Sequence, residues 1–179
     1  LTLVFRKSDK VPLAVSAGLD TVAIRMPANA VALELLRLAS VPVAAPSANR
    51  SGRPSPTTAQ HVMEDLEGLV PFILDDGPCE FGIESTVLDM TVTPPMILRP
   101  GGVTREMLEA ALGSSVSIDA ATGGGSDVKS PKSPGMKYAH YAPRAFMWLY
   151  TGSPDPVGSS IAKDALEFAR SGKRVGILS

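Results

Sequence analysis

The chain has 179 residues, with 17 Lys and Arg against 18 Asp and Glu and a formal net charge of −1. This balance excludes a global basic field for nucleic acid, so any such binding has to be local. No apolar run approaches the roughly 18 residues that a membrane-spanning helix needs, which excludes a transmembrane segment. Cys79 is the single cysteine, so the sequence has no internal disulfide framework and we expect a cytoplasmic protein.

Strand and helix patterns fill the first part of the chain. Apolar and β-branched runs predict strands, and apolar residues at helical spacing predict helices. In chain order these are strands at 1–5, 21–25 and 41–45, strands at 72–74, 85–90 and 96–99, and helices over 28–39, from Ser55, and over 104–112. Ser55 followed by Pro56 is typical of a capped helix start. The elements predict a compact α/β domain over 1–113.

The composition changes at Ser114. Residues 114–145 contain a run of three glycines and two Ser-Pro pairs without helical periodicity, which is typical of a linker. A strand pattern at 146–150, a helix pattern through Phe168 and a strand pattern at 175–178 then predict the start of a Rossmann-like α/β domain over 146–179. Since the chain starts at Leu1 without a leader pattern and stops within a strand pattern, we expect an internal piece of a longer protein.

The densest polar segment is 45–58, which follows the predicted strand 41–45. A loop that leaves a strand and enters a helix is a common ligand site in α/β proteins. Hydroxyl groups, helix amides and the guanidinium groups of Arg50 and Arg53 together suit an anion such as phosphate. The alternative is an ordinary capped loop in which Asn49 and Gly52 serve turn geometry.

Further candidates lie where predicted strands begin or end. Thr21 and Arg25 share one face of a strand, roughly 13 Å apart at about 3.3 Å per residue, so an elongated anion would reach both. The guanidinium group of Arg25 can bind a carboxylate ligand through two N–H groups. The alternative is that Arg25 forms an ion pair on the protein surface. Ser85 begins one predicted strand and Arg99 ends the next. Both are candidates for ligand binding, and the alternative is that they serve only the turns at these junctions.

Other polar groups point less clearly to chemistry. The Asp75-Asp76-Gly77 sequence is more typical of a turn than of a magnesium site. The linker combines basic and aromatic residues, which suits RNA contact, a mobile lid or a solvated tether. These residues are Lys129, Lys132, Lys137, Arg144, Tyr138, His140 and Tyr141. A Gly-x-Ser-x-Gly motif is absent, which disfavours serine hydrolysis.

The order of five strings resembles the YrdC-type L-threonylcarbamoyl-adenylate synthases. The strings are Thr21-Val-Ala-Ile-Arg25, Pro46-Ser-Ala-Asn-Arg-Ser-Gly52, Ser55-Pro-Thr57, Glu84-Ser-Thr-Val87 and Leu98-Arg-Pro-Gly101. The segment Ser133-Pro-Gly-Met-Lys-Tyr-Ala-His-Tyr-Ala-Pro143 is similar to the linker of the family's long, two-domain members, and it is the most specific of these motifs. The resemblance implies an open twisted mixed sheet with helices, followed by a linker and a second domain.

The resemblance also implies a reaction, in which L-threonine, bicarbonate and ATP give threonylcarbamoyl-adenylate and pyrophosphate for tRNA modification. ATP would be held by Thr21, Ser47, Asn49, Ser55 and Arg99, with Tyr138 and His140 closing as a lid. Threonine would be held by Arg25, Ser85 and the backbone near Ala45. Magnesium is expected on the phosphates of ATP, and the chain supplies neither a nucleophile nor a metal site. tRNA and the downstream threonylcarbamoyl transferase are further partners that the resemblance implies.

The sequence departs from the family in extent. Family members begin with a threonine-pocket strand and a Lys-x-Arg motif, and neither precedes Leu1, so we expect this chain alone to have little synthase activity. Two alternatives remain open. One is an RNA-binding module, because the same fold has been linked to double-stranded RNA. The other is the carbamoyl-adenylate domain of hydrogenase maturation, which shares the core strings but is expected to lack the 133–143 linker.

Overall fold

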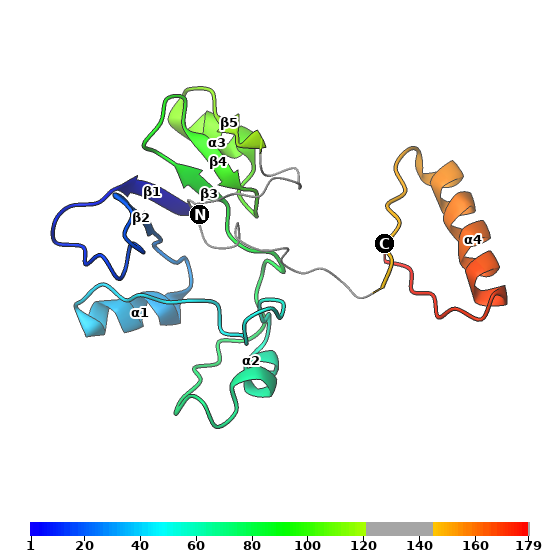
Figure 1. Ribbon diagram of the computed structural model, residues 1–179, viewed down its shortest axis with the longest axis horizontal. Coiled ribbons are helices and arrows are strands. Elements are labelled where there is room, and N and C mark those ends of the chain that lie inside the picture. The colour runs from blue at the N-terminus through cyan, green and yellow to red at the C-terminus, as the bar shows by residue number, and fades with distance from the viewer. Residues whose placement is uncertain (121–144, 179) are drawn as a thin grey trace. The chain divides into compact units, whose positions relative to one another are not determined.

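The computed structural model describes residues 1–120 and 145–178 (Figure 1). The chain divides into two compact units, Leu1–Tyr141 and Ala142–Ser179, and each is treated by itself below. No helix among the described residues is long and apolar enough to cross a membrane.

A mixed five-stranded sheet organises the first unit, as the resemblance predicts. Its strands are β1 (Thr2–Arg6), β2 (Thr21–Ile24), β3 (Val87–Asp89), β4 (Met96–Arg99) and β5 (Ser117–Ile118). They lie in the order β2-β1-β3-β4-β5. The pairs β1/β2 and β3/β4 are antiparallel, whereas β1/β3 and β4/β5 are parallel. The open, mixed sheet is therefore confirmed.

The core lies on both faces of the two central strands. Successive residues of a strand point to opposite faces. On β3, Val87 belongs to one cluster with Val4 and Leu98, while Leu88 belongs to another that includes Leu108. Leu108 lies on α3 (Arg105–Leu112), which Thr104 caps by accepting from the amide of Met107, as predicted. The sheet centre is thus fixed by packing from both sides.

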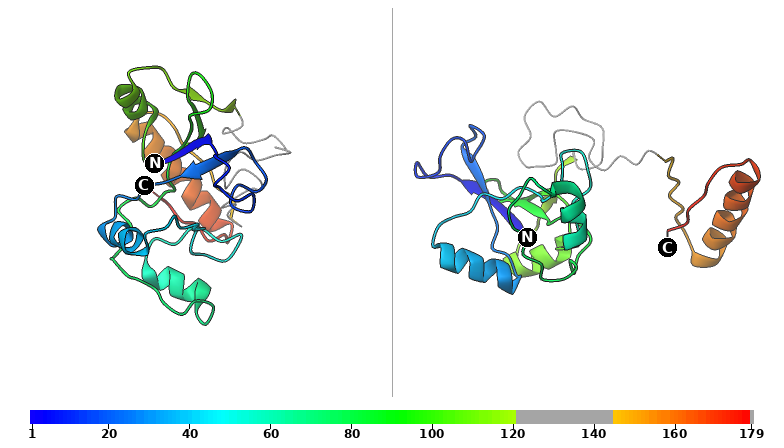
Figure 2. Two further views of the ribbon diagram at one scale, coloured as in Figure 1. Left: turned by 90° about the vertical axis from the view of Figure 1, so that its left-hand side faces the viewer. Right: turned by 90° about the horizontal axis from the view of Figure 1, so that it is seen from below.

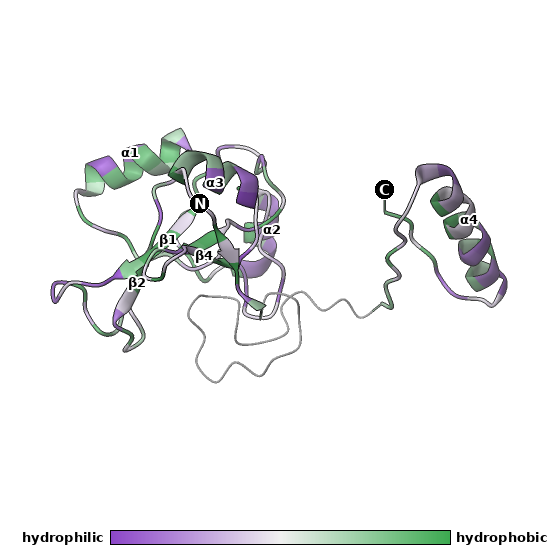
Figure 3. Cartoon of the chain, turned by 90° about the horizontal axis from the view of Figure 1, so that it is seen from above, coloured by the Kyte–Doolittle hydropathy of each residue, from purple (hydrophilic) through white to green (hydrophobic). Residues whose placement is uncertain are grey.

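Helix α1 (Ala30–Ala39) forms as predicted but buries no residue. Asn29 caps it by accepting from the amide of Ala32 at 2.8 Å. The same side chain donates to Asp76 Oδ2 at 2.5 Å, which ties the start of the helix to the 75–77 turn. Leu38 remains 67% exposed. Figure 3 shows α1 mainly in the hydrophobic colour. The apolar side chains whose spacing predicts this helix therefore form no buried stripe in the structure.

Two strand predictions in the first unit are wrong. Residues 41–45 and 72–74 form no strand, and Val43 and Phe72 are 52% and 86% exposed. A strand needs a neighbouring strand to complete its hydrogen bonds, and a β-rich composition does not supply one. Within the described residues, neither segment pairs with another strand.

Two boundaries also differ from the predictions. Helix α2 (Ala59–Leu66) begins later than Ser55, because Thr58 is its cap and accepts from the amide of His61. The segment after Ser114 is not entirely linker, since β5 pairs with β4 and Val116 is only 1% exposed. A two-residue strand carries no periodic signal, which is why the sequence pattern missed it.

The second unit is built around α4 (Pro154–Arg170), which confirms the predicted helix. In the right-hand view of Figure 2 the segments that precede and follow this helix both run along the same side of it. Trp148 stacks on Phe168 at 4.6 Å between ring centroids, and Tyr150 donates to Asp164 Oδ2 at 2.6 Å. The predicted strands 146–150 and 175–178 do not form, because within the described part of the chain they pair with no strand. A Rossmann-like sheet is therefore not seen in the described residues.

Gly101, which follows β4, lies against the backbone of the segment before β3. A Cβ atom at this position would lie 2.3 Å from both the Glu84 carbonyl oxygen and the Thr86 amide nitrogen. Neither backbone atom can move freely, so we expect Gly101→Ala to destabilise the first unit by about 1–3 kcal/mol. Chemical unfolding of the full-length protein measures this change.

Gly82→Ala is the matched control, because nothing lies within 4 Å of the place that its methyl group would take. We expect its free energy of unfolding to stay close to that of the wild type. Equal stabilities for Gly101→Ala and Gly82→Ala would contradict the close approach of the two segments.

Candidate functional site

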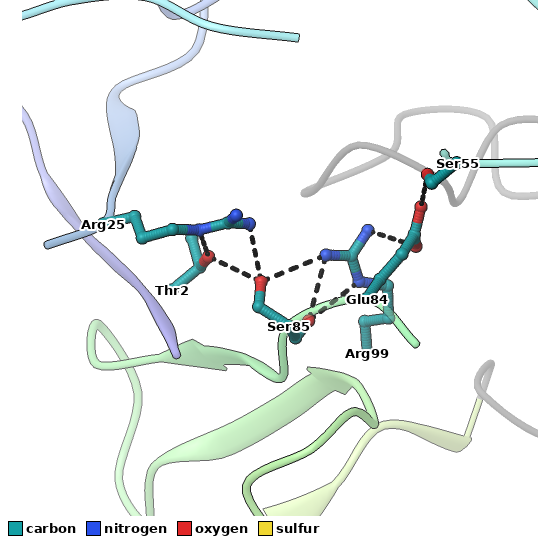
Figure 4. A network of polar contacts seen from close by, with 6 residues as sticks. All are labelled: Thr2, Arg25, Ser55, Glu84, Ser85 and Arg99. Carbon is teal, nitrogen blue, oxygen red and sulfur yellow. Dashed lines mark hydrogen bonds and ion pairs between the residues drawn. The ribbon is translucent and has the colours of Figure 1, made fainter. Parts of the chain in front are cut away.

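The candidate site lies where four strands of the sheet begin or end. Because β1 and β3 run parallel, Thr2 pairs with Val87 and lies beside the segment that carries Ser85. Arg99, the last residue of β4, pairs with Val87 from the other side. Arg25 follows the last residue of β2, the strand that pairs with β1 on its far edge. The sheet topology therefore brings together groups that lie far apart in the sequence (Figure 4).

The Ser85 hydroxyl group lies at the centre of this cluster. Arg25 Nη2 donates to Ser85 Oγ at 2.6 Å, and Arg99 Nη2 approaches the same oxygen at 3.3 Å. Thr2 Oγ1 lies 2.9 Å from Ser85 Oγ and accepts from Arg25 Nε at 3.0 Å. The predicted site residues Arg25, Ser85 and Arg99 are thus brought into one network.

Glu84 completes the network on the side of Arg99. Its Oε2 atom accepts from Arg99 Nη1 at 2.7 Å, and its Oε1 atom accepts from Ser55 Oγ at 3.0 Å. Arg99 also donates to the Ser85 carbonyl oxygen through Nε at 3.1 Å and Nη2 at 2.9 Å. Because the two side chains of the ion pair are only 20% and 28% exposed, the guanidinium group is held in one orientation.

Sequence reasoning gave no role to Thr2 or Glu84. The sequence signal for Glu84 was its place directly before Ser85, where a carboxylate faces a predicted cluster of arginines. Thr2 carries no local signal, because only the parallel pairing of β1 with β3 places it beside Ser85. Both residues are found only once the strand order is known.

The arginines of the 45–58 loop bond to Asp65 on α2, and their predicted role in an anion site stays a prediction. Arg53 pairs with Asp65 on α2, and the Arg50 amide and Nε donate to the same residue at 3.1 and 2.8 Å. Asp65 is only 6% exposed. The Arg53 guanidinium group and the Arg50 amide satisfy this buried carboxylate, and Arg50 Nε bonds the Asp65 carbonyl oxygen, so both residues hold the loop against α2.

Asn49 shapes the same loop and has one unused acceptor. Its Nδ2 donates to the carbonyl oxygens of Arg50 and Arg53 at 2.9 and 3.0 Å. Its Oδ1 is buried and has no hydrogen-bond partner among the described residues. Since a buried acceptor costs free energy when it stays unpaired, this oxygen is suited to a donor group of a ligand.

The remaining predicted residues lie outside the network. Ser47 and Ala45 are exposed, and within the described part of the chain neither side chain makes a hydrogen bond. Thr21 lies at the far end of β2 from Arg25, in the wall of a cavity of about 250 Å³ that also contains Arg6 and Asp89. Tyr138 and His140, with the rest of the predicted lid, lie outside the described residues.

The Asp75-Asp76-Gly77 segment is a turn. Asp75 Oδ1 accepts from the Gly77 amide at 2.9 Å, and Gly77 adopts a φ of +82°. No group of three His, Cys, Asp or Glu side chains suited to a metal occurs among the described residues.

Two families of known proteins match consecutive parts of the chain. Residues 1–101 match the Sua5–YciO–YrdC family, which carries the description "Telomere recombination". Residues 103–179 match "Threonylcarbamoyl-AMP synthase, C-terminal domain". The chain belongs to the Sua5–YciO–YrdC family. This membership agrees with the resemblance noted from the five sequence strings.

Individual members of the family resemble the chain along its whole length. A threonylcarbamoyl-AMP synthase of Pyrococcus abyssi is 48% identical over 99% of this chain and 52% of its own length. One of Bacillus subtilis is 47% identical over 100% of this chain and 50% of its own length. The chain therefore spans about half the length of these curated relatives.

Solved structures of the family share the fold. The crystal structure of P. abyssi Sua5 complexed with L-threonine matches 99% of this chain and 53% of that chain, with a TM-score of 0.88 and 46% identity. A doubly substituted form of the same protein matches with a TM-score of 0.82. The open mixed sheet is thus the fold of this family.

Asp65 gives a test of how the loop is held. Burial raises the pKa of this carboxyl group, but hydrogen bonds from the Arg50 amide and from Arg53, together with their charges, bring the pKa below its ordinary value of 3.8. A folded-state pKa below the unfolded one stabilises the protein at neutral pH, and this contribution is lost as the pH falls below 3.8. We expect Asp65→Asn to be less stable than the wild type at pH 7, with the difference shrinking in acid.

Urea unfolding between about pH 7 and pH 3 measures this difference. Glu64→Gln, on the exposed surface of the same helix, is the control and should change stability little at any pH. If the free energies of unfolding of the wild type and Asp65→Asn differed by the same amount over this whole pH range, the role of the ionised carboxylate would be contradicted.

Proposed function

We propose that the protein is an L-threonylcarbamoyl-adenylate synthase, which forms threonylcarbamoyl-AMP and pyrophosphate from L-threonine, bicarbonate and ATP. The observation that carries the proposal is the convergence of Arg25, Ser85 and Arg99 at one end of the sheet. The names of the relatives and the complex of P. abyssi Sua5 with L-threonine support the same activity. The product would serve the threonylcarbamoylation of tRNA, with tRNA and a downstream transferase as later partners.

The amino acid half of the site would be formed by Arg25, Ser85 and the backbone near Ala45. A carboxylate accepts hydrogen bonds, and the guanidinium group of Arg25 only donates them. Arg25 Nε and Nη2 are already oriented by Thr2 and Ser85, so the remaining N–H groups are presented in a fixed direction. Such an oriented fork binds a carboxylate with little further loss of side-chain entropy.

The nucleotide half would be formed by Arg99 with hydroxyl and amide groups of the 45–58 loop. Glu84 links the two, because its carboxylate accepts from both Arg99 and Ser55. The other residues proposed for ATP are Thr21, Ser47 and Asn49, with Tyr138 and His140 from the segment outside the described residues. The described side chains offer no three-carboxylate cage, so magnesium would arrive on the phosphate oxygens of ATP.

The chemistry needs positioning more than a reactive side chain. The threonine amine and bicarbonate give a carbamate and water. An oxygen of the carbamate then attacks the α-phosphorus of ATP, and pyrophosphate leaves. Both reactants are anions that repel each other, so guanidinium groups on either side lower the barrier by charge neutralisation and alignment. Arg25 and Arg99 share Ser85 Oγ and are suited to hold the two anions close together.

The rival functions receive less support. The match of residues 103–179 to the synthase C-terminal domain favours the synthase over a carbamoyl-adenylate domain of hydrogenase maturation. The RNA-binding alternative depends on Lys129, Lys132 and Lys137, which lie outside the described residues, and it stays a prediction.

Arg25→Ala tests the amino acid half. We expect the affinity for L-threonine to fall roughly 30-fold or more, because the loss of one partner of a charged hydrogen-bonded pair costs about 2 kcal/mol or more. Affinity for a nonhydrolysable ATP analogue should change much less. Ser47→Ala should show the reverse pattern, with weaker nucleotide binding. Calorimetry of the full-length protein measures both affinities.

Pyrophosphate release with all three substrates is the activity assay, and Arg105→Ala is the control. Arg105 lies on α3, where it donates to Glu109 on the helix surface. The control should keep wild-type activity. The proposed function would be refuted if the full-length protein released no pyrophosphate, or if Arg25→Ala in that protein bound L-threonine as the wild type does.

A further inference from the structure

Thr2 is a buried polar residue next to the network. It is the first residue of β1 and is 7% exposed. Its amide donates to the Thr86 carbonyl oxygen at 2.8 Å, and its backbone pairs with Val87. The position of its hydroxyl group is therefore set by the central strands of the sheet.

The direction of each hydrogen bond around Ser85 follows from the chemistry of the groups. Guanidinium groups only donate, so Ser85 Oγ accepts from both Arg25 and Arg99. With both lone pairs used, the Ser85 hydroxyl donates its own proton to Thr2 Oγ1. Thr2 Oγ1 then accepts from Ser85 and from Arg25 Nε, so both of its lone pairs are also used.

This count leaves the Thr2 hydroxyl proton without an acceptor among the described residues. The Nη1 group of Arg25 also has no acceptor within that part of the chain, where Arg25 makes no ion pair. Arg99, by contrast, has the carboxylate of Glu84. The Arg25 side of the network thus has an excess of donors, and a ligand that supplies only acceptors would satisfy them.

We propose that Thr2 is a further residue of the amino acid site, whose hydroxyl group recognises the substrate carboxylate together with Arg25. This inference rests on the proposed function. A carboxylate has two oxygens that accept in one plane, and one of them would take an N–H of Arg25 while the other takes the Thr2 proton (Figure 4). Ser85 would then act on the substrate through Arg25 and Thr2, because its hydroxyl group fixes the Thr2 rotor so that this proton is available.

A purely structural role for Thr2 makes a different prediction. If Thr2 only stabilised the strand, its loss would weaken every amino acid ligand that uses the site. If its hydroxyl recognises the carboxylate, the loss acts on ligands with a carboxylate and not on neutral analogues. The ratio of affinities for L-threonine and L-threoninamide, in which an amide replaces the carboxylate, separates the two roles.

The test compares Thr2→Val with Thr2→Ser in the full-length protein by calorimetry. Valine keeps the β-branched shape that suits the strand and removes the hydroxyl group, whereas serine keeps it. For Thr2→Val we expect L-threonine affinity to fall about tenfold or more, with L-threoninamide affinity changed less than about threefold. Thr2→Ser should retain the wild-type ratio.

Thr86→Val is the matched control. Thr86 is also a buried threonine, and its hydroxyl group bonds to the backbone of Val103 at 2.6 and 3.1 Å. Its replacement should lower the melting temperature and leave the affinity ratio unchanged. If Thr2→Val does not fold, Thr2→Ala against Thr2→Ser provides the same comparison of one hydroxyl group.

An unchanged ratio in a folded variant that lacks the Thr2 hydroxyl would overturn the inference and leave the proposed function intact. A wild-type protein that binds no L-threonine would overturn the proposed function and this inference together. A lower ratio in Thr2→Val with a wild-type ratio in Thr2→Ser and Thr86→Val supports the inference.

Discussion

The hydroxyl group of Ser85, shared by two guanidinium groups, is the interaction on which the site depends. Arg25 and Arg99 are brought to one oxygen although their charges repel. Glu84 neutralises Arg99 alone, and the Ser85 carbonyl oxygen orients it from a second direction. The remaining positive charge therefore lies at Arg25, where a bound anion is most strongly stabilised. Arg99 thus has a carboxylate partner in Glu84, whereas Arg25 has none among the described residues.

The backbone holds this arrangement more firmly than the side chains do. Thr2 and Ser85 meet because β1 and β3 are parallel neighbours, and a one-residue slip between them would turn Thr2 to the opposite face. Val4, Val87 and Leu98 pack together on adjacent strands and oppose such a slip. Core packing and substrate recognition therefore depend on the same register, so a mutation of the core would also alter the site.

Strand ends could be predicted from the sequence, but contacts between distant strands could not. The strand at 96–99, which ends at Arg99, is a local pattern and is confirmed, whereas Arg25 lies one residue after β2 and Ser85 two residues before β3. Thr2 and Glu84 gain their roles from long-range pairing, which periodicity does not encode. The bonds of Arg50 and Arg53 to Asp65 could not be predicted for the same reason, since Asp65 lies on a helix whose orientation no local pattern shows.

The two halves of the site are attached to the fold in different ways. The half proposed for the amino acid lies at the ends of the ladder of β1, β2 and β3, which backbone hydrogen bonds hold together. The 45–58 loop contains no strand and is held by side chains, through Asp65 to α2 and through the bond from Ser55 to Glu84. Side-chain contacts of this kind can be exchanged for contacts to a ligand at lower cost than a strand can be displaced. Ser55 and Arg99 both bond to Glu84, so a nucleotide that draws on either group would also shift the carboxylate that neutralises Arg99. Nucleotide binding would in this way change the charge presented to the amino acid across Ser85, which couples the two half-sites through a single side chain.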